Sequence, residues 1–296
     1  MTMKPSEPGV SPALILFIGV SAISTGAIFA RLADAPALVV AAYRVGLATL
    51  ILAPVAMVRS RRELMGLSSR DLWMAVLSGF FLAIHFAAWI SSLEYTSVAN
   101  SVVLVNTNPI WVGILTPFLT HETIRRSTVI GIGLSVCGGI VIGIGDIAIG
   151  SDALFGDALA LVGSMAMALY ILMGRKLRRK LSLVAYVLLC YGSAAVFLWA
   201  CVLIVGLPIT GFSTATWACL WGLAAVSQVI GHSSFNWALR WLGASMIAVA
   251  LLGEPVGATI LAYLVLGEGL TGFKIVGGML ILSAIYITAA GERTNN

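Results

Sequence analysis

The segment ALLGEPVGATILAYLVLGE, from Ala250 to Glu268, has the character of a membrane-spanning helix with a carboxylate and a proline side by side. Glu254 falls near the centre of a longer apolar run, at the depth where a charge is most costly in a bilayer. Pro255 has no backbone N–H, so the carbonyl of Leu251 loses its helical partner. Such freed groups are tolerated at membrane depth only where they face protein or a water-filled cavity. The segment therefore predicts a membrane protein with a polar site in its interior.

The composition of the whole chain agrees with this prediction. Of 296 residues, 60% are hydrophobic and 10% are charged, whereas about 25% charged residues is typical of soluble domains. The apolar runs recur along the chain and are too long for the alternating strands of a membrane barrel. We therefore expect an all-α integral membrane protein with ten transmembrane helices. The expected helices lie near 11–31, 36–58, 72–93, 97–120, 127–145, 153–174, 182–206, 214–238, 243–266 and 271–290.

The basic residues predict the orientation. If the termini and alternate loops share one side, that side carries all of the 17 lysines and arginines except Arg31, Arg44 and Lys274. Positively charged loops stay in the cytoplasm, so both termini are expected there, in a multi-pass protein of the cytoplasmic (inner) membrane. The net charge of +5 is accounted for by this topology, and no nucleic-acid partner is expected.

The sequence also repeats itself. A shift of 146 residues without gaps superimposes five pairs of similar or identical residues. The pairs are Leu93 with Leu239, Tyr95 with Trp241, Pro109 with Pro255, Glu122 with Glu268, and Gly131 with Gly277. The halves are expected at 11–145 and 153–290, with five helices each. Because five is odd, the second half must cross the membrane inverted, which is an architecture of secondary transporters.

The motifs that carry the repeat resemble those of the drug/metabolite transporter superfamily, in its ten-helix form with two EamA-like domains. In the first half they are Arg44 and SLEYTSVANSVVLVNTNPIW, followed by Glu122. In the second half they are GDALALVGSMAMALYILMGRKL and ALRWLGASMIAVALLGEPVGATILAYLVLGEGL. The resemblance implies an exporter with a central cavity, and the amino-acid and aromatic amino-acid exporters are the best functional match. It implies no cofactor.

Two polar-proline pairs mark the expected transport path. Asn108 precedes Pro109 as Glu254 precedes Pro255, and both pairs lie in mid-helix. Helix breaks at equivalent positions of two repeats indicate a substrate site. Glu254 is expected to bind a substrate ammonium or to carry a proton, which makes protons a candidate coupling ion. The alternative is a structural carboxylate that pairs with Arg44 or accepts hydrogen bonds from neighbouring hydroxyl groups.

Two polar stripes at helical spacing are further candidates for substrate binding. One holds His85, Trp89 and Ser92; the other holds Gln228, His232 and Asn236. Polar stripes in a membrane bundle turn inward, either to a cavity or to bond between helices. The expected substrate-binding set is His85, Trp89, Asn108, Trp111, Ser24, Ser164, Gln228, His232, Asn236 and Glu254.

Other polar residues are expected to be structural. Arg44 is expected to reach the interface or to pair with Glu94 or Glu268, and Asn106 to lie on a different face from Asn108. The four cysteines form no CxxC pair and no metal site is expected.

Other functional classes fit less well. The residues GIGD, Gly143–Asp146, match a pattern of intramembrane aspartyl proteases, but no second mid-membrane aspartate is available, so no catalytic residue is expected. A channel would require repeated donors along one path. We therefore expect an exporter of amino acids and similar small amphiphilic metabolites. Nucleosides and cationic drugs are the alternative substrates. The sequence does not determine the oligomeric state, and it is compatible with a monomer.

Overall fold

The computed structural model describes residues 9–96, 98–119, 123–144, 151–267 and 269–293, and those residues form helices and their connections without strands. The elements in chain order are α1 (Pro12–Ile23), α2 (Gly26–Leu32), α3 (Ala37–Arg59), α4 (Arg61–Met65), α5 (Ser69–Tyr95), α6 (Val98–Val105), α7 (Asn108–Leu119), α8 (Arg126–Ile144), α9 (Ser151–Arg178), α10 (Leu183–Val205), α11 (Thr214–Gly222), the π-helix η1 (Leu223–His232), α12 (Ser233–Ala238), α13 (Ala244–Leu251), α14 (Gly253–Leu261), the π-helix η2 (Ala262–Leu266) and α15 (Gly272–Arg293).

Within these described ranges, nine helical segments are long and apolar enough to cross a membrane. A shorter apolar segment, Arg126–Val141 within α8, occupies the place of the fifth expected helix. Their sequences explain the boundaries. Ser182 begins α10 by accepting a hydrogen bond from the backbone N–H of Ala185 at 3.2 Å, and Gly206 ends it with a positive φ of 75°.

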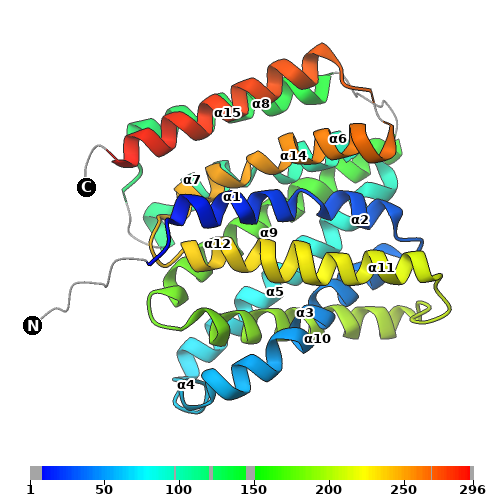
Figure 1. The fold of residues 1–296 in the computed structure, drawn as a ribbon, viewed down its shortest axis with the longest axis vertical. Helices are drawn as coiled ribbons and strands as arrows, with labels where there is room; N and C mark the ends of the chain where they lie inside the picture. The colour runs from blue at the N-terminus through cyan, green and yellow to red at the C-terminus, as the bar shows by residue number, and fades with distance from the viewer. Residues whose placement is uncertain (1–8, 97, 120–122, 145–150, 268, 294–296) are drawn as a thin grey trace, which may run out of the picture.

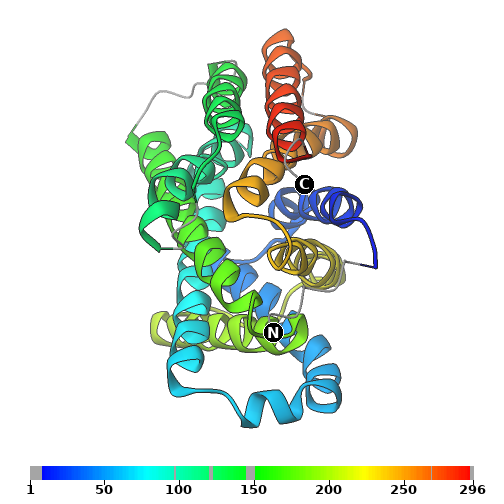
Figure 2. The ribbon, with the colours of Figure 1, turned by 90° about the vertical axis from the view of Figure 1, so that its left-hand side faces the viewer.

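The helices run side by side across the molecule, with the start of α1 and the end of α15 at the same end (Figure 1). Helix α5 packs extensively against α9 and α10, and α10 packs against α3. Helices α8 and α15 pack against each other at one edge of the bundle, which is the upper edge in Figure 2. The core of the bundle includes the fully buried rings of Tyr170, Tyr186 and Tyr191.

Four of the expected continuous helices are interrupted. The break at Asn106 and Thr107 separates α6 from α7, and the break at Leu252 separates α13 from α14, as Pro109 and Pro255 indicate. The first expected helix is present as the span Pro12–Leu32, but it has a break at Ser24 and Thr25 that no proline indicates. The expected helix at 214–238 is present as the span Thr214–Ala238, but its middle is the ten-residue π-helix η1, which the sequence did not predict. Short π-helical stretches are frequent at functional sites.

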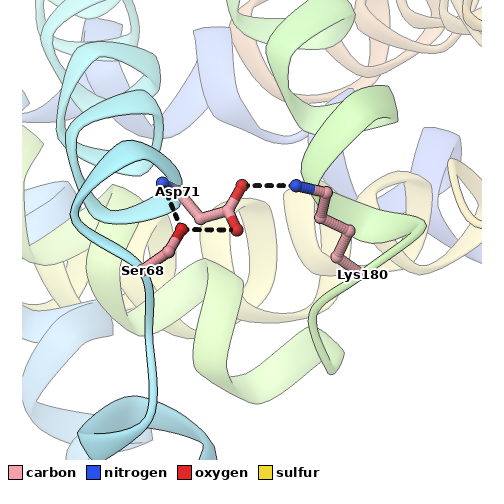
Figure 3. Close-up of polar contacts among 3 residues, drawn as sticks. All are labelled: Ser68, Asp71 and Lys180. Carbon is pink, nitrogen blue, oxygen red and sulfur yellow. Dashed lines mark hydrogen bonds and ion pairs between the residues drawn. The ribbon is translucent and has the colours of Figure 1, made fainter.

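A polar cluster at the start of α5 joins it to the segment that follows α9. Ser68 accepts a hydrogen bond from the backbone N–H of Asp71 and donates one to its carboxylate, and Lys180 pairs with the same carboxylate at 2.7 Å (Figure 3). The side chain of Lys180 is 57% exposed, so this ion pair contributes at most about 1 kcal/mol. Nearby, Glu63 accepts a hydrogen bond from the backbone N–H of Ser182 at 2.6 Å.

Candidate functional site

The helix breaks surround a small cavity of about 20 Å³. It is lined by Ile23, Arg44, His85, Trp89, Val105, Asn106, Asn108, Met167, His232, Leu251 and Glu254. A space of this size holds about one water molecule. The helices are therefore packed too closely in this conformation to hold a metabolite, and a substrate could enter only after they move apart.

The first break, between α6 and α7, forms part of the cavity lining and satisfies some of its own hydrogen-bonding groups. Pro109 leaves the carbonyl of Val105 without its helical donor, and the side-chain amide of Asn108 donates to that carbonyl at a long 3.4 Å. The amide oxygen of Asn108 is buried and has no hydrogen-bond partner. The break thus presents an unpaired acceptor beside the cavity.

The second break contributes a carboxylate residue, Glu254, to the lining of the same cavity. Glu254 lies in the first turn of α14, where the partial positive charge of a helix N-terminus favours an anion. Its side chain is hydrogen-bonded to that of Asn106, and its charge interacts with that of Arg44. Its backbone carbonyl accepts a hydrogen bond from the hydroxyl of Ser24 at 3.4 Å. Asn106, which was expected on a different face from Asn108 and as a structural residue, lines the same cavity as Asn108.

Sequence reasoning offered Arg44 as a partner of Glu254 but left it out of the substrate-binding set, whereas Arg44 lines the cavity. It is 1% exposed and donates from Nε to the side-chain oxygen of Gln228 at 2.8 Å. Its guanidinium carbon lies 4.0 Å from the ring centroid of Phe86. The expected pairing with Glu94 was wrong, since the Glu94 carboxylate accepts a hydrogen bond from the backbone N–H of Ala37. The other expected partner, Glu268, lies outside the described residues, as do Glu122 and Asp146 of the GIGD motif.

The two histidines of the polar stripes face each other, with ring centroids 6.4 Å apart. Nδ1 of His85 lies 3.0 Å from the carbonyl of Gly163. A carbonyl only accepts, so this ring nitrogen carries the proton of the bond. Trp89 stacks on His85 at 6.0 Å, and both line the cavity with His232. The structure therefore brings these three expected residues together.

The remaining expected residues lie elsewhere. The amide nitrogen of Asn236 bonds to the hydroxyl of Tyr170 and to the carbonyl of His232, outside the cavity lining. Ser164 bonds to Thr107 at 2.9 Å. Trp111 is half-buried at the edge of the core. Ser24 does not line the polar cavity but an apolar groove on its far side, bounded by α1, α14 and α15, with a volume of about 540 Å³.

Several residues at the polar cavity have buried side-chain atoms without a hydrogen-bond partner. They are Nη1 of Arg44, Nε1 of Trp89, Oδ1 of Asn108 and Nδ1 of His232, with Nε2 of Gln228 beside them. Each unpaired buried polar atom costs about 1–3 kcal/mol, and native structures contain few of them. Their concentration around one space, together with an acid and a guanidinium, is the arrangement of a site that binds a polar ligand.

A membrane-spanning helical bundle with such a site at its helix breaks has the features of a membrane transporter. The chain belongs to the EamA-like transporter family, whose model matches residues 10–144 and 154–290.

Comparisons with individual proteins agree with this membership. The chain is 27% identical over 228 residues to an uncharacterized transporter of Archaeoglobus fulgidus, covering 76% of this chain and 78% of the relative. It is 26% identical over 253 residues to the uncharacterized transporter YetK of Bacillus subtilis, covering 77% and 71%. A solved crystal structure superimposes with a TM-score of 0.78 at 18% identity, over 96% of this chain and 99% of the other, which shows the fold alone.

Proposed function

We propose that the protein is a secondary transporter that exports amino acids and similar small amphiphilic metabolites across the cytoplasmic membrane. The observation that carries the proposal is the polar cavity, where a carboxylate, a guanidinium and several unpaired donors and acceptors lie together inside a membrane-spanning bundle. Such groups are costly at that depth unless a ligand or ion uses them. Ten spans in two inverted five-helix repeats, with both termini in the cytoplasm, form part of this proposal.

The helix breaks support a mechanism of alternating access. The cavity walls include the break at Asn106 and Thr107 and the break at Leu252, with the break at Ser24 and Thr25 directly behind Glu254. Backbone at such positions has fewer helical hydrogen bonds, so it can absorb the change in angle when helices rock apart. The conformation described here is the one in which the walls meet.

The test is substrate flux in proteoliposomes made with the purified protein. Radiolabelled methionine, threonine and phenylalanine are measured at clamped pH for the wild type, Glu254→Gln and Glu94→Gln. Glu94→Gln is the matched control. The Glu94 carboxylate accepts a hydrogen bond from the backbone N–H of Ala37 away from the cavity, and the amide oxygen of glutamine accepts the same bond.

We expect saturable flux in the wild type and in Glu94→Gln, and loss of flux in Glu254→Gln. A variant that keeps flux but loses its dependence on pH identifies Glu254 as the proton site. Correctly folded wild-type protein that carries no amino acid overturns the substrate assignment, and the same vesicles are then tested with nucleosides and cationic drugs.

A further inference from the structure

The two charged residues at the cavity differ in chemistry and come from different helices. Glu254 on α14 accepts hydrogen bonds, while Arg44 on α3 donates them. Their charges interact. Each side chain is also hydrogen-bonded to an amide, Glu254 to Asn106 and Arg44 to Gln228.

The protein does not use all of the hydrogen-bond donors of Arg44. A guanidinium has five N–H donors in a planar fork, which suits a carboxylate bonded through both oxygens. Nε is used by Gln228, while Nη1 is buried and has no partner. The face of the guanidinium lies over Phe86, so the ring fixes its plane but uses none of its donors. The unpaired Nε2 of Gln228 offers a further donor next to it.

The Glu254 pole is complementary. Glu254 lines the same cavity as Asn108, whose buried amide oxygen has no partner. Acceptors from two residues of one cavity match the N–H donors of an ammonium group. From these contacts we infer that Arg44 is the specificity-determining residue that binds the carboxylate of a zwitterionic α-amino acid, while Glu254 binds its ammonium.

This inference rests on the proposed function and narrows its substrate class. A bound zwitterion replaces the attraction between Arg44 and Glu254 with two direct, charge-assisted contacts. A cationic drug would satisfy Glu254 and leave the buried charge of Arg44 without compensation, which is strongly unfavourable. A nucleoside would bring no charge to either pole. The site therefore selects ligands that carry both charges.

The experiment is a competition assay in proteoliposomes. Unlabelled methionine, methioninamide and N-acetylmethionine compete with radiolabelled methionine for transport. Methioninamide lacks the carboxylate and N-acetylmethionine lacks the ammonium. In the wild type both analogues compete about 10- to 100-fold more weakly than methionine, because each leaves one buried charge unpaired.

The variants separate the two poles. In Arg44→Gln the ratio between methioninamide and methionine falls to about 1, while N-acetylmethionine stays weak. Glu254→Gln, measured by binding, shows the opposite pattern. Arg178→Gln is the matched control, since Arg178 is also 1% exposed but bonds backbone carbonyls outside the cavity, so its analogue ratios stay at the wild-type values.

A second variant guards against misfolding of Arg44→Gln. Gln228→Glu keeps the arginine and places a new carboxylate against its Nε, so the carboxylate pole is already occupied and discrimination against methioninamide is lost. Equal competition by methioninamide and methionine in the wild type overturns the inference and leaves the proposed function intact. Absence of any amino-acid flux overturns the proposed function, and the inference with it.

Discussion

Replacing Gly257 with alanine tests how the wall behind the cavity is built. A Cβ added at this position would lie 2.3 Å from the hydroxyl oxygen and 2.7 Å from the Cβ of Ser24, whereas ordinary contacts begin near 3.4 Å. Helix α1 must therefore retreat from α14 by roughly 1 Å, which weakens the bond from Ser24 to the Glu254 carbonyl. Overpacking of this degree costs about 1–3 kcal/mol.

The assay for Gly257→Ala is thermal unfolding of the purified protein in detergent, combined with transport. We expect the unfolding midpoint to fall by roughly 2–12 °C, from a cost of about 1–3 kcal/mol and a scaling of about 2–4 °C per kcal/mol. Gly133→Ala is the control, because nothing lies within 4 Å of its added Cβ in the middle of α8 and alanine favours a helix. Its midpoint should stay or rise.

The double variant Ser24→Gly with Gly257→Ala separates the clash from other effects. Removing the Ser24 side chain takes away both clashing atoms, so the double variant should be more stable than the sum of the single effects indicates. The reasoning is refuted if Gly257→Ala is as harmless as Gly133→Ala, or if Ser24→Gly gives no recovery.

Three other substitutions have graded outcomes. Gly79→Ala should abolish the yield of folded protein in size-exclusion chromatography, because its Cβ would lie 2.3 Å from the backbone carbonyl of Cys190, which cannot rotate away as a side chain can. Arg178→Gln should lower the unfolding free energy by about 1–3 kcal/mol, measured by denaturant titration, because the Asn236 carbonyl loses a charged donor. Lys180→Met should change it by less than about 1 kcal/mol, and less still at high salt, since that ion pair is exposed.

The helix breaks that precede Pro109 and Pro255 could be predicted, because the effect of proline on backbone hydrogen bonds is local. The missing N–H and the freed carbonyl belong to residues four positions apart in one chain, so the sequence contains both partners. The apolar runs also predicted most spans, since the requirement for about 20 apolar residues is set by the bilayer. The local effect of proline and the thickness of the bilayer are therefore enough to predict these two breaks and most of the spans.

The partners of Arg44 could not be predicted in this way. Gln228 comes from η1 and Phe86 from α5, and their approach depends on how three helices pack. A spacing of four residues also placed Asn236 on the face of His232, and both side chains contact Tyr170. Asn236 nevertheless lies outside the cavity lining, and this could not be predicted because it depends on how α12 packs against α9.

The two repeat-related breaks are chemically unequal, and this difference explains why Glu254 stands where it does. Asn108 has a side-chain amide N–H, so it can donate a hydrogen bond to the carbonyl of Val105, which loses its helical donor at Pro109. An ionised Glu254 only accepts hydrogen bonds and cannot serve the carbonyl of Leu251 in the same way. An asparagine at 254 would stabilise the second break better by this local criterion. A carboxylate at that position gains from the N-terminus of α14 but cannot supply the donor that the carbonyl of Leu251 loses. This local cost fits a ligand-binding role, since sequences depart from local rules mainly at functional sites.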